Sequence, residues 1–160
     1  MEISIIAVGK MKNGPERELF SRYSDRAVKT GRQLGLTGFC VLELSESQKK
    51  TASERKTQEA IAIRNALPKG AIFVVLDENG KSLGSKDFSN YISRWRDEAV
   101  SHLYFIIGGA DGLEYSLIKQ ANFSLGFSAM TWPHQLVRIM LAEQLYRTTT
   151  ILSSHPYHRS

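Results

Sequence analysis

Small, flexible and hydroxyl-bearing residues follow two short apolar runs in the second half of the chain. Gly108 and Gly109 come after the run 104–107, and Ser128 to Trp132 come after the run 123–127. If both runs are parallel strands, these loops lie at strand carboxyl ends, which is where open α/β sheets bind ligands. Glycine after a strand lets a ligand approach the backbone closely, but it also simply turns the chain, and both interpretations stay open.

The two loops do not match the common nucleotide-binding motifs. Residues 107–112 read IGGADG, which lacks the spacing of a dinucleotide fingerprint, and the chain contains no GKS or GKT of a phosphate loop. Thr131, Trp132 and Pro133 instead predict the start of a helix, with Pro133 near its first turn. The alternatives here are a capped helix with a core tryptophan, or a phosphate bound at the helix amino terminus.

The closing residues SSHPYHRS are rich in groups that bind or titrate. Three of the four histidines lie from His134 onward, and two of them are in this segment. A frayed terminus is the usual fate of such residues. Histidine titrates near neutral pH, however, so a functional tail is the competing interpretation.

The helix predicted from Pro133 to about Thr149 is apolar around much of its circumference. Its main polar interruptions are Arg138, Glu143, Gln144 and Arg147. A helix that is apolar on most sides is buried on most sides. In a chain of this size, the pattern predicts a subunit interface as well as a core contact.

The remaining pattern alternates strands and helices. Short apolar runs predict strands at 3–8, 39–44, 71–76, 103–107 and 123–127. Helical spacing predicts four further helices. The first begins at Pro15, and the second packs through Ala60, Ile61, Ile63 and Leu67. The third is capped by Ser85, and the fourth spans 113–121. Asn79-Gly80 predicts a turn at 77–80. The pattern indicates an α/β fold with a parallel sheet flanked by helices, in a single domain spanning 1–160.

Composition is that of an ordinary globular protein of 160 residues, with 42% hydrophobic and 23% charged residues. No apolar run approaches the roughly 20 residues of a membrane span, and the amino terminus lacks a signal-peptide pattern, so we expect no membrane and a cytoplasmic location. The single Cys40 excludes an internal disulfide and a thiolate zinc cluster, and its apolar surroundings predict a buried structural thiol. A net charge of +5 permits a polyanionic partner.

Several motifs in this order resemble one known family. They are Leu76 after an apolar strand, IIGGADG, LGFSAMTWPHQLVR, AEQLYR and the terminal HPYHR. Together they are similar to the SPOUT class of methyltransferases and, within it, to the small single-domain RlmH family, which methylates N3 of a pseudouridine in 23S ribosomal RNA. The resemblance spans the whole chain and departs from the family at the extra Ser160.

The resemblance implies a parallel α/β sheet whose carboxyl-terminal segment forms a trefoil knot, a rare exception to the rule against knots. It also implies S-adenosylmethionine as cofactor, no metal, and a homodimer whose active sites are completed across the interface. The substrate would be 23S rRNA within the ribosome. The cofactor residues carried over are Leu76, Gly108, Phe127, Ser128, Ala129, Met130, Thr131 and Trp132.

The implied catalytic residues are Tyr157, His158, Arg159 and Arg147. Methyl transfer from a sulfonium depends mainly on positioning. His158 could act as a base for the N3 proton. The alternative, which we favour, makes Tyr157 a stacking surface, His158 a hydrogen-bonding group, and both arginines phosphate contacts. His134 is expected to cap or pack at the helix start.

Two other functions compete with the enzyme. A non-enzymatic RNA- or ribosome-binding module explains the basic charge but leaves the glycine loop unused. A flavodoxin-like nucleotide-binding protein explains the sheet and loops but not the tail.

Overall fold

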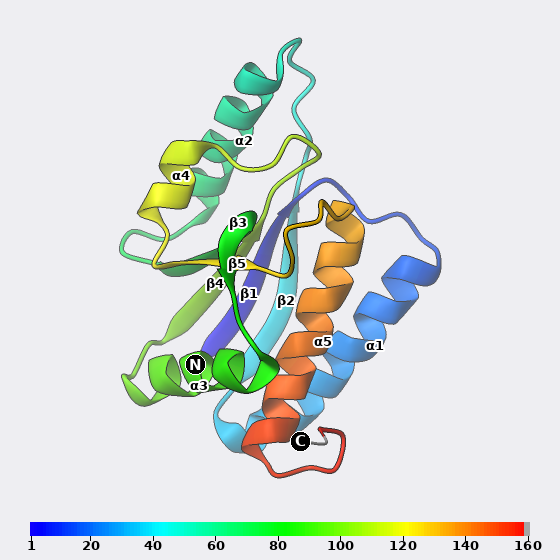
Figure 1. Cartoon of the computed structure of the whole chain (residues 1–160), viewed down its shortest axis with the longest axis vertical. Helices are drawn as coiled ribbons and strands as arrows, with labels where there is room; N and C mark the ends of the chain where they lie inside the picture. Colours follow the sequence, from blue (N-terminus) through cyan, green and yellow to red (C-terminus); the bar gives the residue numbers. More distant parts are fainter. Residues whose placement is uncertain (159–160) are drawn as a thin grey trace.

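The computed structural model describes residues 1–158, and its centre is one sheet of five parallel strands (Figure 1). The strands are β1 (Glu2–Val8), β2 (Thr37–Leu44), β3 (Ile72–Ser82), β4 (His102–Ile107) and β5 (Phe123–Gly126). Their order across the sheet is β2-β1-β4-β3-β5. The predicted α/β class and each of the predicted strands are confirmed.

Helices cover both faces of the sheet (Figure 1). They are α1 (Pro15–Gly31), followed by the short 3-10 turn η1 (Arg32–Leu34), α2 (Ala52–Ala66), α3 (Ser85–Asp97), α4 (Tyr115–Gln120) and α5 (His134–Leu152). The first face carries α1, α3 and α5, and the second carries α2 and α4. With both faces covered, the inner strands read as nearly continuous apolar runs.

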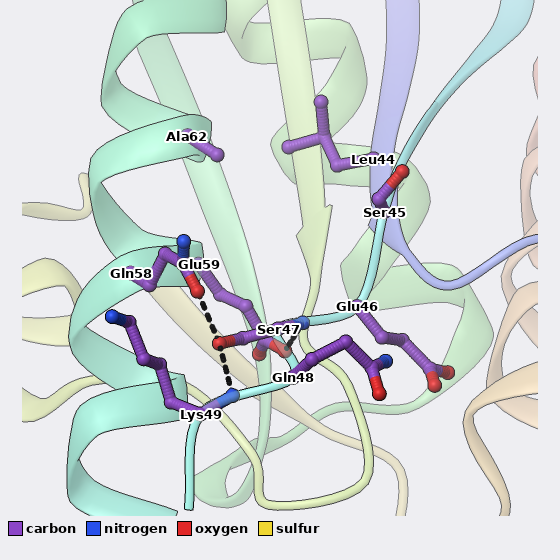
Figure 2. A pocket seen from close by; sticks show the side chains of 9 residues that line it. All are labelled: Leu44, Ser45, Glu46, Ser47, Gln48, Lys49, Gln58, Glu59 and Ala62. Atoms are coloured by element: carbon purple, nitrogen blue, oxygen red, sulfur yellow. Dashed lines mark hydrogen bonds between the residues drawn. The ribbon is translucent and has the colours of Figure 1, made fainter.

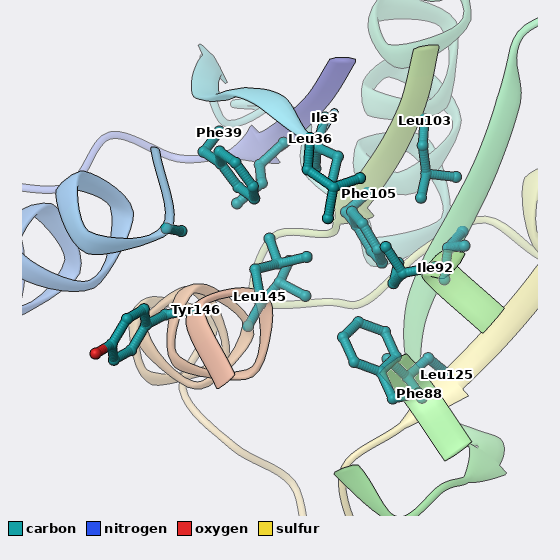
Figure 3. Close-up of a cluster of buried hydrophobic side chains, with 14 of the residues drawn as sticks. Ile3, Leu36, Phe39, Phe88, Ile92, Leu103, Phe105, Leu125, Leu145 and Tyr146 are labelled. Atoms are coloured by element: carbon teal, nitrogen blue, oxygen red, sulfur yellow. The ribbon is translucent and has the colours of Figure 1, made fainter. Parts of the chain in front are cut away.

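The core divides into two clusters because successive side chains of a strand point to opposite faces. In β1, Ile5 and Ala7 pack in the larger cluster with α1, α3 and α5 (Figure 3), whereas Ile6 and Val8 pack in the smaller cluster with α2 and α4. This alternation fixes which strand residues face each layer.

Helix α5 lies against α1 and α3 on the first face, and Leu141 and Leu145 are buried there. Its own chain therefore accounts for most of the apolar surface from which a subunit interface was predicted. Leu136, near the start of α5, is a large apolar residue, and it is 40% exposed. The subunit interface remains a prediction.

The turn predicted at 77–80 is wrong, since β3 continues through it to Ser82. The pairing with β5 shifts there, so that both Leu76 and Lys81 pair with Leu125. A Cβ atom at Gly80 would lie 2.6 Å from the Leu125 carbonyl carbon, and one at Gly126 would lie 2.7 Å from the Gly80 carbonyl oxygen. Glycine at both positions thus lets the two backbones touch. The trefoil knot remains a prediction from the resemblance.

Three smaller expectations are also wrong. Cys40 is exposed, because it lies on the edge strand β2 with its sulfur 3.2 Å from the Ser4 hydroxyl. Ile61 is 53% exposed on the outer face of α2. Ser85 is the first helical residue of α3, and Gly84 holds the cap position without a side-chain hydrogen bond.

Candidate active site

The predicted cofactor residues come together where β4 and β5 end, beside Leu76 in the middle of β3. Leu76 pairs with Ile107 on one side and with Leu125 on the other. Gly108 directly follows β4, and the segment 127–132 follows β5, so residues from three chain segments converge there. Parallel strand order, which the sequence does not reveal, produces this convergence.

The segment 127–132 is folded around Ser128. The Ser128 hydroxyl oxygen accepts hydrogen bonds from the Met130 amide at 2.9 Å and from the Trp132 indole nitrogen at 3.2 Å. The Thr131 hydroxyl donates to Glu78 at 2.9 Å, which fastens this segment to the end of β3. Ala129 is exposed, Phe127 packs on the core, and Met130 and Trp132 are 70% and 41% exposed. The segment therefore offers hydroxyl groups and uncovered apolar surface, which suit a ligand with a flat ring and polar substituents.

The glycine loop, residues 108–112, is a tight turn. The Gly112 amide donates to the Gly109 carbonyl at 3.0 Å. A Cβ atom at Gly108 would lie 2.9 Å from the Gly112 carbonyl carbon and 3.0 Å from Leu113 Cγ. The fold of the loop alone requires a glycine at 108, so glycine there does not by itself indicate a ligand.

Helix α2 holds the glycine loop through Arg55. This guanidinium donates to both Asp111 carboxylate oxygens, at 2.6 and 2.9 Å, and to the Lys49 and Lys50 carbonyls, at 3.0 Å each. The hydrogen bond from Arg55 lowers the pKa of Asp111, and the same bond raises the pKa of Arg55. Thr51 starts the helix with a reciprocal capping box to Glu54. One helix thereby ties the segment 45–50 to the glycine loop.

A hollow of about 520 Å³ opens between α2 and the segment that follows β2 (Figure 2). It is lined by Leu44, Ser45, Glu46, Ser47, Gln48, Lys49, Gln58, Glu59 and Ala62. The Glu59 carboxylate is 94% buried, since only 6% of the residue is exposed, and its Oε1 accepts the Ser47 amide at 2.9 Å. Its Oε2 has no hydrogen-bond partner among the residues that the structure describes. The sequence did not predict Glu59 as a site residue. Its position four residues before Ile63 places it on the buried face of α2.

A second buried charge lies beneath the ends of β1 and β2. Arg138 of α5 is 1% exposed and donates to Glu43 at 2.8 Å, to the Val8 carbonyl at 2.9 Å and to the Gly9 carbonyl at 2.5 Å. Burial lowers the pKa of Arg138, while Glu43 acts in the opposite direction. Arg138, predicted only as a polar interruption of the apolar helix, therefore faces the core and not solvent. Its helical spacing from Leu141 and Leu145 was the available sign that it faces the core.

The predicted catalytic residues gather at the other end of α5. The Tyr157 hydroxyl donates to Glu143 at 3.1 Å, and its ring lies 4.6 Å from the Tyr146 ring and 4.9 Å from the Arg147 guanidinium carbon. His158 Nδ1 is 3.5 Å from Arg147, which also donates to Glu143 at 3.0 Å. Burial, followed by the nearby Glu143 charge, raises the pKa of Tyr157 to about 12. Arg159 lies outside the described residues.

The predicted cofactor residues and the predicted catalytic residues do not meet within one chain. Helix α5 has 19 residues and is therefore about 28 Å long, with the segment 127–132 before its first turn and the tail after its last (Figure 1). The tail folds back on its own helix, but Tyr157 reaches only Glu143, halfway along α5. His134 is the first residue of α5 and not its cap, but its side chain is only 22% exposed and packs at the helix start, with Nε2 3.9 Å from Glu46 Oε1.

Residues 1–158 contain neither a membrane-spanning helix nor a cluster of metal ligands. No helix in that range is long and apolar enough to cross a membrane. Within the same range, no group of three or more His, Cys, Asp or Glu side chains is arranged as a metal site.

Comparisons with known proteins agree on one family. Residues 1–158 match the family model described as "Predicted SPOUT methyltransferase". The chain is 50% identical over 159 residues to a protein of Nitrobacter hamburgensis named "Ribosomal RNA large subunit methyltransferase H", with 99% of each chain covered. It is 52% identical over 160 residues to a protein of that name from Rhodopseudomonas palustris, with each chain covered completely.

A solved structure supports the fold independently. It is described as a probable methyltransferase from Bordetella pertussis, and it is similar to this chain with a TM-score of 0.54 at 11% identity, over 92% of this chain and 95% of its own. At that identity the likeness concerns the fold alone. The family match, the full-length relatives and the sheet with its loops lead to one conclusion: this chain belongs to the SPOUT methyltransferase family.

Proposed function

We propose that the protein transfers the methyl group of S-adenosylmethionine to N3 of a pseudouridine in the 23S rRNA of the large ribosomal subunit, acting on the assembled ribosome as a homodimer. One observation carries the proposal: Leu76, Gly108 and the segment 127–132 come together where β4 and β5 end. Full-length relatives named as methyltransferases of large-subunit ribosomal RNA support the reaction and the substrate class.

The residues that come together there fit the cofactor. The exposed side chains of Met130 and Trp132 provide apolar surface for an adenine ring, and the hydroxyls of Ser128 and Thr131 provide polar contacts. When bound, S-adenosylmethionine supplies an electrophilic methyl group; its sulfur keeps the bonding electron pair and becomes a neutral thioether. The chain contributes binding and orientation, through a glycine loop that Arg55 holds in place.

The separation of the tail from the cofactor residues supports a shared active site. In one chain, Tyr157 folds back only to Glu143, halfway along α5, so about 14 Å of helix lies between that contact and the segment 127–132. A second subunit running in the opposite direction would bring its tail to these residues. In that arrangement Tyr157 would stack on the base, His158 would hydrogen-bond to it, and Arg147 and Arg159 would contact phosphates. Because Glu143 already binds Arg147, that contact requires a shift of one of the two side chains.

Two measurements test the proposal. Calorimetry should detect one S-adenosylmethionine per subunit, and a methylation assay should compare free rRNA, isolated large subunits and whole ribosomes. We expect methyl incorporation at pseudouridine N3 to be highest on whole ribosomes. RNA binding without cofactor binding would instead establish the non-enzymatic RNA-binding module.

A further inference from the structure

We propose that the hollow of Figure 2 receives the base that is methylated, and that Glu59 Oε2 accepts a hydrogen bond from the N1–H of pseudouridine. Glu59 would then be the residue that distinguishes pseudouridine from uridine. This inference rests on the proposed function and adds a specificity-determining residue to it.

The hollow lies beside both predicted cofactor loops. Glu59 Oε2 is 3.2 Å from the position that a Cβ atom of Gly109 would occupy, so the carboxylate borders the glycine loop. On the other side, Glu46 Oε1 lies 3.9 Å from Nε2 of His134, the first residue of α5 and close to the end of the segment 127–132. A base in the hollow would therefore be adjacent to a cofactor held by these loops.

The carboxylate of Glu59 offers an acceptor that the chain itself does not use. Oε1 accepts the Ser47 amide, whereas Oε2 is buried and has no donor within residues 1–158. A buried acceptor without a donor is costly, so native proteins normally provide a partner. Oε2 is closed to solvent in this conformation, and a base would reach it by displacing the Ser47 side chain while the Ser47 amide stays on Oε1. The Ser47 hydroxyl bond to Gln58 lies at the surface, and its replacement by water costs little.

The chemistry of the two nucleosides makes this oxygen selective. In pseudouridine the sugar is attached through C5, which leaves an N1–H donor on the ring edge where uridine has a carbon-bound hydrogen. A site built to hydrogen-bond an N–H group rejects an analogue that lacks it, because the buried acceptor then stays unpaired. Leu44 and Ala62 provide apolar surface for the ring, and Gln58 provides an amide for its carbonyl groups.

The isosteric variant Glu59→Gln tests the proposal. The Ser47 amide needs an acceptor, so it should hold the glutamine carbonyl and place the NH₂ group at the Oε2 position. Two donors would then face each other when pseudouridine binds. We expect the ratio of kcat/KM for pseudouridine-containing over uridine-containing RNA of the same sequence to fall about tenfold or more. Affinity for S-adenosylmethionine, measured by calorimetry, should stay at the wild-type value.

Glu98→Gln makes the same chemical change at the carboxyl-terminal cap of α3, in an exposed ion pair with Arg94, and should leave the ratio unchanged. Melting curves establish that each variant is folded, and Glu59→Asp, which keeps the charge, should retain part of the preference. An unchanged ratio in folded Glu59→Gln would overturn the inference while wild-type methylation upholds the proposed function. A parallel loss of cofactor affinity would also overturn it, since Oε2 would then serve the cofactor. Absence of methylation by wild-type enzyme would refute the proposed function itself.

Discussion

Arg138 and Glu59 are charged side chains at helix positions that face the core, where leucine would be the ordinary choice. Arg138 organises the carboxyl ends of β1 and β2, because it binds the carbonyls of Val8 and Gly9 and the carboxylate of Glu43. Glu43 also accepts the Met11 amide at 2.8 Å. The loop that follows β1 is thus shaped by one buried ion pair.

The change Arg138→Met should destabilise the fold by about 3–5 kcal/mol, because it leaves Glu43 and two buried carbonyls without their donor. Urea unfolding measures this loss. Adding Glu43→Leu should recover part of it, since it removes the carboxylate that has lost its nearest cation, Arg138. Arg94→Met, which breaks the exposed pair with Glu98, should cost only about 0–1 kcal/mol. A loss below about 1 kcal/mol for Arg138→Met would contradict the structural role.

At the scale of elements, the tail is a segment docked on α5 through one tyrosine. Tyr157 packs on Tyr146 and donates to Glu143. Its pKa rises from the ordinary value of 10.0 to about 12, first because of burial and then because Glu143 disfavours a second negative charge. The unfolded chain therefore loses this proton before the folded chain does.

The sign of the shift gives a pH dependence. Docking of the tail should be fully stable below pH 10 and should weaken as the pH rises from 10 towards 12. Tyrosine absorbance at 295 nm should show one group that titrates near pH 12, and Tyr157→Phe should remove that group. If the group that is lost in Tyr157→Phe titrated near pH 10 and not near pH 12, the docked position of Tyr157 would be refuted. Tyr104, whose pKa is also raised by burial, titrates in both proteins and serves as the internal reference.

At the scale of the whole molecule, the length of α5 separates the predicted cofactor residues from the tail. Complementation between two inactive variants tests whether the tail acts on its neighbour. One variant is Ser128→Leu, which removes both hydrogen bonds that shape 127–132, and the other lacks residues 157–160. Gly108→Val is less suitable, because its side chain would meet the Gly112 backbone whether or not a ligand is bound.

A mixed dimer in which the tail acts on its neighbour has one site with both defects and one site with neither. Methylation should then return to about half of the wild-type rate per mixed dimer. If the tail acts within its own chain, each site carries one defect and activity stays at background. Background activity despite subunit exchange, confirmed by mass spectrometry of the mixed dimer, would exclude the shared site.

The sequence by itself determined which segments form strands and helices, and which loops carry glycine and hydroxyl residues. Apolar runs and helical spacing depend on residues close together in the chain, so the five strands and their helices were predictable. The motifs around Gly108 and Ser128 to Trp132 also indicated the family from sequence alone. The exact bounds, and the continuation of β3 through 77–80, depended on a partner strand that the local pattern does not reveal.

Only the tertiary structure decided which residues share a space. Strand order brought Leu76, Gly108 and Ser128 together, and the packing of α2 and α5 on the sheet buried Glu59 and Arg138. Cys40 became exposed because β2 lies at the edge of the sheet, a position that its apolar neighbours did not indicate. The physical reason is the same in each case: burial and proximity depend on contacts between residues far apart in the chain, whereas periodicity reports only the local backbone.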